Sequence, residues 1–125
     1  MPKKKTELGR WRTDVDPLNY PAATSYLSLI YPPKRVEKLI AKLKLARIVH
    51  FKAKDIFRAS QLSLLGISNS HVEKDRIKLR AGKKLSPLLL VREETHGRVI
   101  VADGYHRLCA VYQVDEDALI PCKIV

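Results

Sequence analysis

A chain of 125 residues, 46% of them hydrophobic, can bury a core of its own without a disulfide framework or a structural metal. Its net charge of +11 at pH 7 favours polyanionic partners, nucleic acid first. No apolar stretch is long enough to cross a membrane, and the basic start at Met1 to Lys5 is not followed by an apolar signal core, so we expect a cytoplasmic protein with no membrane partner.

The basic charge is concentrated in the first two thirds of the chain. Residues 1–84 hold 20 lysines and arginines against 7 acidic residues, whereas residues 85–125 hold 4 against 6. Residues 1–20 are predicted to form a basic flexible arm in which Arg10 and Arg12 contact the phosphates of a nucleic acid; the alternative is that the arm only keeps the protein soluble. A single domain is predicted over residues 21–125, and it begins with a helical extension over about 21–45.

Two helices are predicted in this extension. The first runs from Pro21 to Ile30, and its apolar side is formed by Ala22, Tyr26, Leu29 and Ile30. The second runs from about Lys34 to Leu45 and buries residues spaced at i, i+3, i+4 and i+7, namely Val36, Leu39, Ile40 and Leu43. Its opposite side carries Lys34, Lys38 and Lys42, which fit a phosphate backbone, although an ordinary solvated helix face is the favoured interpretation of this helix taken alone.

The middle of the chain supplies scaffold elements. A strand is predicted over residues 47–51, with a short turn or helix after it over residues 54–58. Ser70 and Glu73 fit the capping-box pattern, so a helix is expected from His71 to Ala81, ended by Gly82. His50 and His71 are predicted to be surface or capping residues.

The last third alternates strands with one helix. The apolar run that starts at Leu88 is predicted to be a buried strand, and a hairpin turn at His96-Gly97 joins it to a strand that starts at Val99. A helix follows Gly104, and Ile120 to Val125 form a final strand. Cys109 and Cys122 have no metal-binding spacing and are expected to be small core residues. These elements predict an α/β (α+β) fold in which helices flank a small mixed β-sheet.

The sequence Asp103-Gly104-Tyr105-His106-Arg107 lies where the second of these strands meets the helix. The first N–H groups of a helix have no intrahelical acceptor and attract anions, and glycine lets the backbone approach a ligand closely. We therefore expect Gly104 to Arg107 to bind phosphate, with the guanidinium of Arg107 and the imidazole of His106 as further donors. The alternative is that Asp103 is a plain N-cap and Arg107 a solvated helix residue.

The order of these elements, with a proline-bearing strand, an Asp-Gly-x-His-Arg helix start and a final Ile-Pro strand, resembles the ParB/sulfiredoxin superfamily over residues 46–125. The resemblance implies a nucleotide phosphate site at Asp103, Gly104, His106 and Arg107, and phosphoryl chemistry in several members. Tyr105 stands where sulfiredoxins carry their nucleophilic cysteine, so their repair chemistry is not expected. Partition proteins have an acidic residue there and continue into a helix-turn-helix domain, which this sequence lacks.

These observations predict that the chain binds a nucleotide or another phosphorylated ligand. If it is an enzyme, metal-dependent phosphoester hydrolysis, on nucleotide or DNA, or phosphoryl transfer is expected. Asp103 would then hold Mg²⁺ brought with a nucleoside triphosphate, His106 would exchange protons and Arg107 would neutralise charge on phosphate oxygens. The alternative is a non-catalytic module that senses a nucleotide or binds nucleic acid. The sequence gives no sign of zinc or haem, and it leaves homo-oligomer formation open.

Overall fold

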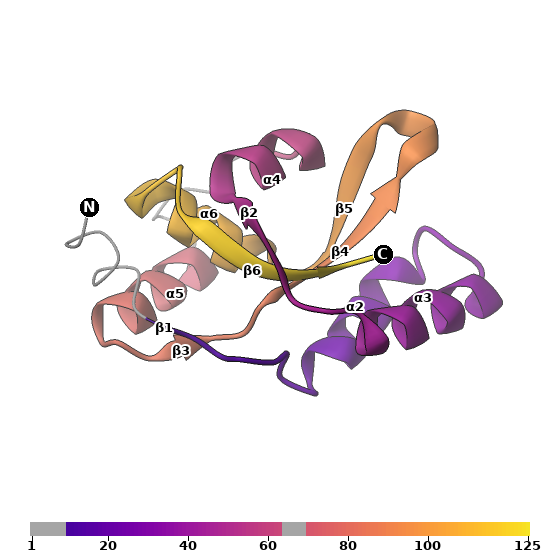
Figure 1. Ribbon diagram of the computed structural model, residues 1–125, viewed down its shortest axis with the longest axis horizontal. Coiled ribbons are helices and arrows are strands. Elements are labelled where there is room, and N and C mark those ends of the chain that lie inside the picture. The colour runs from indigo at the N-terminus through magenta and orange to yellow at the C-terminus, as the bar shows by residue number, and fades with distance from the viewer. Residues whose placement is uncertain (1–9, 64–69) are drawn as a thin grey trace.

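The computed structural model describes residues 10–63 and 70–125. A four-stranded mixed sheet lies between two layers of helices, as Figure 1 shows. This arrangement confirms the predicted α/β fold with flanking helices. In the described parts of the chain, no helix combines the length and the apolar character needed to span a membrane.

The strand order in the sheet places the last strand of the sequence in the interior. Strand β6 (Leu119–Ile124) pairs antiparallel with β2 (Val49–Lys52) on one side and parallel with β4 (Leu88–Glu93) on the other. Strand β5 (Arg98–Asp103) pairs antiparallel with β4 at the sheet edge. The short helix η1 (Glu94–His96) and Gly97 join β4 to β5, so the predicted hairpin turn is confirmed.

Alternate residues of β4 face the two helical layers, as the two-residue period of a strand requires. Leu89 and Val91 pack against helices α2 (Asn19–Leu27) and α3 (Pro33–Leu45). Leu88 and Leu90 belong to the cluster on the other face, which is covered by α4 (Ala53–Ser60), α5 (Ser70–Arg80) and α6 (Tyr105–Val114). Cys109 and Cys122 form no disulfide and are fully buried in this second cluster, as predicted.

Helix α3 has the buried and exposed sides that its sequence predicts. The four apolar residues that the helical spacing singled out, Val36, Leu39, Ile40 and Leu43, are buried. Lys34, Lys38 and Lys42 are exposed along the opposite side.

The apolar side predicted for the first helix is wrong. Helix α2 begins at Asn19 and ends at Leu27, and it buries Ala23 and Leu27. The four residues expected to be apolar contacts, Ala22, Tyr26, Leu29 and Ile30, are exposed, Leu29 to 84%. A shift of one residue turns a helix by about 100°, so the docking of α2 on the sheet selects a different stripe from the one that hydrophobicity suggested.

Part of the segment expected to be a flexible arm is packed. Strand β1 (Arg10–Trp11) pairs in parallel with β3 (Lys84–Leu85), and the side chain of Val15 is only 4% exposed. The N–H of Arg12 donates to the carbonyl of Leu85 over 2.8 Å. Burial of apolar groups therefore holds this segment against the domain despite its basic charge. Residues 1–9 lie outside the described part of the chain.

Helix α5 ends at the predicted glycine. The N–H of Gly82 donates to the carbonyl of Leu79, and the N–H of Lys83 donates to the carbonyl of Lys78. These two bonds form a Schellman motif, and Gly82 supplies the positive φ of 71° that the motif needs.

Candidate functional site

The strand-turn-helix corner forms as the sequence predicts. Strand β5 ends at Asp103, Gly104 takes a φ of 107°, and α6 begins at Tyr105. The first helical hydrogen bond runs from the N–H of Leu108 to the carbonyl of Gly104 over 2.9 Å. No side chain of the described residues caps this helix, so Asp103 is not an N-cap, and the first-turn N–H groups have no acceptor within the helix.

Only glycine fits at position 104. A Cβ atom there would lie 2.8 Å from Cγ of Leu88 and 2.8 Å from Nη2 of Arg107. Most residues other than glycine also avoid positive φ values. The corner is therefore set by both the backbone conformation and the close approach of two side chains.

Arg107 is anchored underneath this corner. Its Nη2 donates to Oδ2 of Asp103 over 3.1 Å and to the carbonyl of Pro87 over 3.3 Å. The side chains of Arg107 and Asp103 are only 15% and 18% exposed, and Nε of Arg107 is buried without a partner among the described residues. One nitrogen of the guanidinium therefore holds the corner and the side chain is mostly buried, contrary to the solvated arginine of the alternative interpretation.

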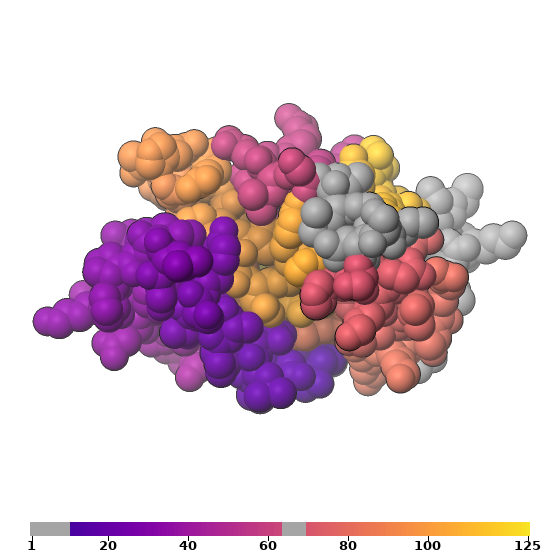
Figure 2. All heavy atoms as spheres, turned by 180° about the vertical axis from the view of Figure 1, so that it is seen from behind, coloured from indigo at the N-terminus to yellow at the C-terminus, as the bar shows by residue number. Residues whose placement is uncertain are grey.

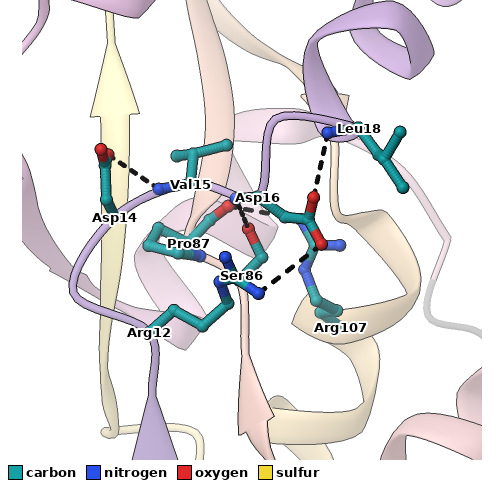
Figure 3. Close-up of polar contacts among 8 residues, drawn as sticks. All are labelled: Arg12, Asp14, Val15, Asp16, Leu18, Ser86, Pro87 and Arg107. Atoms are coloured by element: carbon teal, nitrogen blue, oxygen red, sulfur yellow. Dashed lines mark hydrogen bonds and ion pairs between the residues drawn. The ribbon is translucent and has the colours of Figure 1, made fainter.

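The N-terminal segment packs beside this anchor. Figure 3 shows the segment from Arg12 to Leu18 passing over Ser86 and Pro87, with the Arg107 side chain reaching Pro87 from α6. The N–H of Asp16 donates to Oγ of Ser86 over 3.0 Å, and Arg12 forms an ion pair with Asp16 at 3.7 Å. One of the arginines expected to contact nucleic acid thus has an intramolecular partner.

A cavity of about 200 Å³ opens between α5 and α6. The corner and the first turn of α6 contribute Asp103, Gly104, His106 and Arg107 to its lining. Helix α5 contributes His71, Lys74, Asp75 and Lys78. The atoms of α5 and α6 adjoin on the face of the molecule drawn in Figure 2.

Packing against α6 aims one side of α5 at the cavity. Val72 and Leu79 are buried in the cluster that includes Leu108, and Nη1 of Arg76 donates to Oε1 of Gln113 on α6 over 3.2 Å. These contacts turn the stripe at i, i+3, i+4 and i+7 toward the cavity. Its residues are His71, Lys74, Asp75 and Lys78. The sequence analysis missed all four residues, although their helical spacing is the signal that would have found them.

Two imidazoles meet at the cavity. The ring centroids of His71 and His106 lie 4.8 Å apart with an interplanar angle of 39°. Burial, and next the charge of His71, lower the pKa of His106 below its usual value of 6.5, although Asp75 and Asp103 oppose the shift. His106 therefore favours the neutral form, which can accept a proton. His71 was expected on the surface or at a cap, and its side chain lies at this site instead.

Tyr105 does not reach the cavity. Its ring packs against the core cluster on the α6 side of the sheet, and burial, with Cys109 close by, raises the pKa of its hydroxyl to about 12. Among the five residues predicted to form the site, the structure therefore brings Asp103, Gly104, His106 and Arg107 together and leaves Tyr105 aside.

The residues predicted to bind nucleic acid lie elsewhere. Lys34, Lys38 and Lys42 are on α3, on the side of the sheet opposite α5 and α6. Arg10 is in β1, and Arg12 does not line the cavity.

The donor set of the cavity does not suit Mg²⁺ by itself. This ion prefers six oxygen ligands, whereas the cavity offers two carboxylates, of which Asp103 is paired with Arg107, among two lysines and two histidines. Within residues 10–63 and 70–125, no three His, Cys, Asp or Glu side chains form a group that could hold a metal ion. Binding of Mg²⁺ with a nucleotide stays a prediction.

Comparison of the chain with family models, with curated proteins and with solved structures gives no match. The resemblance to the ParB/sulfiredoxin superfamily therefore stays a prediction from the sequence motifs.

Proposed function

We propose that this chain binds the phosphate group of a nucleotide or another small phosphorylated ligand in the cavity between α5 and α6. One observation carries the proposal: Lys74, Lys78 and the pair of histidines surround a cavity that also borders the amino end of α6. Lysine ammonium groups, imidazoles and unpaired helix N–H groups are all donors to phosphate oxygens. Their convergence from two helices favours an anion over an apolar ligand.

The size of the cavity limits how much of a ligand enters it. Its volume of about 200 Å³ is below the roughly 300 to 1,000 Å³ of a typical ligand cleft. We infer that a phosphate group enters and that the rest of the ligand lies across the surface outside. A terminal phosphate group fits such a cavity better than a phosphate group that is linked to the rest of the ligand on both sides.

Phosphoester hydrolysis is the catalytic extension of this proposal. A neutral His106 would take a proton from the attacking water while the bond from phosphorus to the leaving oxygen breaks, and the leaving oxygen would take a proton from solvent. The lysines would stabilise charge on the phosphate oxygens, and Arg107 paired with Asp103 would hold the corner in place. Release of inorganic phosphate from nucleotides by the purified protein, with and without Mg²⁺, tests this extension. Loss of the release in His106→Asn, with binding retained, is the expected result.

Calorimetric titration with inorganic phosphate, AMP and ATP tests the binding itself, each with and without Mg²⁺. Lys78→Glu should weaken phosphate binding by roughly tenfold or more, because it removes a charge-assisted hydrogen bond and adds repulsion. The matched control is Lys38→Glu, which makes the same charge change on α3, away from the cavity. Equal affinities in the two variants would contradict the proposal.

Nucleic-acid binding along α3 is the second candidate function. It is favoured by the exposure of Lys34, Lys38 and Lys42, which lie one turn apart on the same side of the helix. For this function the same two variants give the opposite result: Lys38→Glu weakens DNA or RNA binding for all sequences and reduces its salt dependence, and Lys78→Glu leaves both unchanged. Salt-independent binding, or binding unaffected by Lys38→Glu, would rule this function out.

A further inference from the structure

The cavity that we propose for phosphate also contains a carboxylate that an anion should avoid. Asp75 is half-buried and lines the cavity with His71, Lys78 and His106. No hydrogen bond or ion pair joins Asp75 to another residue of the described chain. A fully ionised phosphate beside this carboxylate would be repelled, unless the ligand brings a hydrogen atom to share with it.

We propose that Asp75 is a specificity residue that selects phosphate groups bearing a hydroxyl hydrogen, and so prefers hydrogen phosphate and phosphate monoesters to sulfate and phosphodiesters. The inference rests on the proposed function and names its ligand class. The P–O–H group donates to the Asp75 carboxylate while the other oxygens accept from the lysines, the histidines and the helix N–H groups. Sulfate and diesters of similar shape have no such hydrogen near neutral pH and leave the carboxylate facing a bare anion.

The position of Asp75 indicates that the hydrogen bond to its carboxylate comes from the P–O–H group of the ligand and not from a sugar hydroxyl. The same lysines and histidines that would bind phosphate surround the carboxylate, and the cavity has room for little beyond the phosphate group. Burial raises the pKa of Asp75 even though Lys78, Arg107 and both histidines oppose the shift. The ionised carboxylate of Asp75 is therefore destabilised when it has no hydrogen-bond donor. A hydrogen bond from the ligand removes that cost.

Competing anions provide the test. Calorimetry near the second phosphate pKa of about 6 compares inorganic phosphate and phenyl phosphate with sulfate and dimethyl phosphate. The intact protein should bind the first two about tenfold or more tightly than the last two, because a hydrogen bond to a charged group is at stake. In Asp75→Asn the amide can donate to any anion, so the ratio of phosphate to sulfate affinity should fall close to one.

Matched controls separate this role from a general effect. Asp55→Asn makes the same change on α4, outside the cavity, and should keep the selectivity. Asp75→Ser is a second neutral variant that should lose it, and thermal unfolding verifies that both cavity variants are folded. Raising the pH above about 6 removes the hydrogen of phenyl phosphate and leaves the P–O–H group of inorganic hydrogen phosphate in place, so the ratio of phenyl phosphate to sulfate affinity should fall only in the intact protein. The other charged and titratable groups that line the cavity are the same in the intact protein and in both Asp75 variants, so the comparison between these proteins isolates Asp75; these groups are His71, Lys74, Lys78, Asp103, His106 and Arg107.

The possible failures are distinguishable. If neither phosphate nor sulfate binds, the proposed function and this inference are both overturned. If phosphate binds but sulfate binds equally well, or if Asp75→Asn keeps the preference, only the selectivity is overturned and the phosphate site stands.

Discussion

Nη2 of Arg107 lies 3.1 Å from Oδ2 of Asp103, and this ion pair joins the end of β5 to the first turn of α6. Both side chains are mostly buried, so the ion pair is largely shielded from solvent. We expect a double-mutant cycle with Asp103→Ala and Arg107→Ala to give a coupling energy of about 1 to 3 kcal/mol in urea unfolding.

The exposed pair Glu73–Arg80, at 3.5 Å, is the control for that cycle. Its coupling should lie below about 1 kcal/mol, because solvent screens charges on an exposed helix face. Similar coupling energies for the two pairs would show that the Asp103–Arg107 pair does not hold the corner.

The glycine at the corner should be harder to replace than the glycine of the hairpin. Gly104→Ala is expected to reduce the free energy of unfolding by about 2 to 5 kcal/mol, since the new methyl group meets Leu88 and Arg107 in a backbone conformation that alanine avoids. Gly97→Ala, at a φ of 61° with no atom within 4 Å, should cost only about 1 to 2 kcal/mol. Denaturant unfolding of both variants measures the difference, and equal costs would mean that the close approach at Gly104 is relieved.

The corrected burial of α2 predicts opposite results for two neighbouring leucines. Leu27 is fully buried, so Leu27→Ala should cost about 2 to 5 kcal/mol through loss of apolar burial and a residual cavity. Leu29 is 84% exposed, so Leu29→Ala should change stability by no more than about 0.5 kcal/mol. Thermal or urea unfolding of the two variants decides between the observed stripe and the one expected from sequence; a large effect at Leu29 would favour the latter.

Stability should fall as the solution is acidified below pH 6.5, in part because of His106. Its folded-state pKa is lowered by burial and by His71, so the unfolded chain takes up a proton first as the pH drops through the usual value of 6.5. Above that pH the group contributes no such loss. His106→Gln should therefore show a shallower fall in unfolding free energy between about pH 7 and pH 5.

The matched control for the mutation is His50→Gln, which makes the same substitution at an exposed side chain on β2, outside the cavity. His50→Gln should follow the intact protein across the same pH range. A fall that is as steep in His106→Gln as in the intact protein would show that His106 titrates alike in the folded and unfolded chain.

The parts of the fold that the sequence predicted are those encoded by local patterns. The spacing of Val36, Leu39, Ile40 and Leu43 determines which side of α3 is buried, and Gly97 and Gly104 mark turns that only their backbone freedom permits. The strand-turn-helix junction over residues 103–107 was predicted for the same reason, because its residues are consecutive, whereas the ion pair between Asp103 and Arg107 was not predicted.

The rest depends on contacts between distant segments. The sequence around Arg10 and Trp11 does not reveal that these residues pair with β3, more than seventy positions away. The buried stripe of α2 is selected by the sheet on which it docks. Half of the cavity comes from α5, and its His71 and Asp75 gain their chemical setting only because α6 packs beside them.

The interior position of β6 has a consequence for biosynthesis. Until residues 119–124 emerge from the ribosome, β2 has no neighbour and the hairpin of β4 and β5 has one open edge, although every helix has already been made. Because chains emerge amino end first at about 5 to 20 residues per second, we expect the sheet to stay unfinished until β6 has emerged. The nascent chain would then be a natural client for chaperones that shield apolar strand edges.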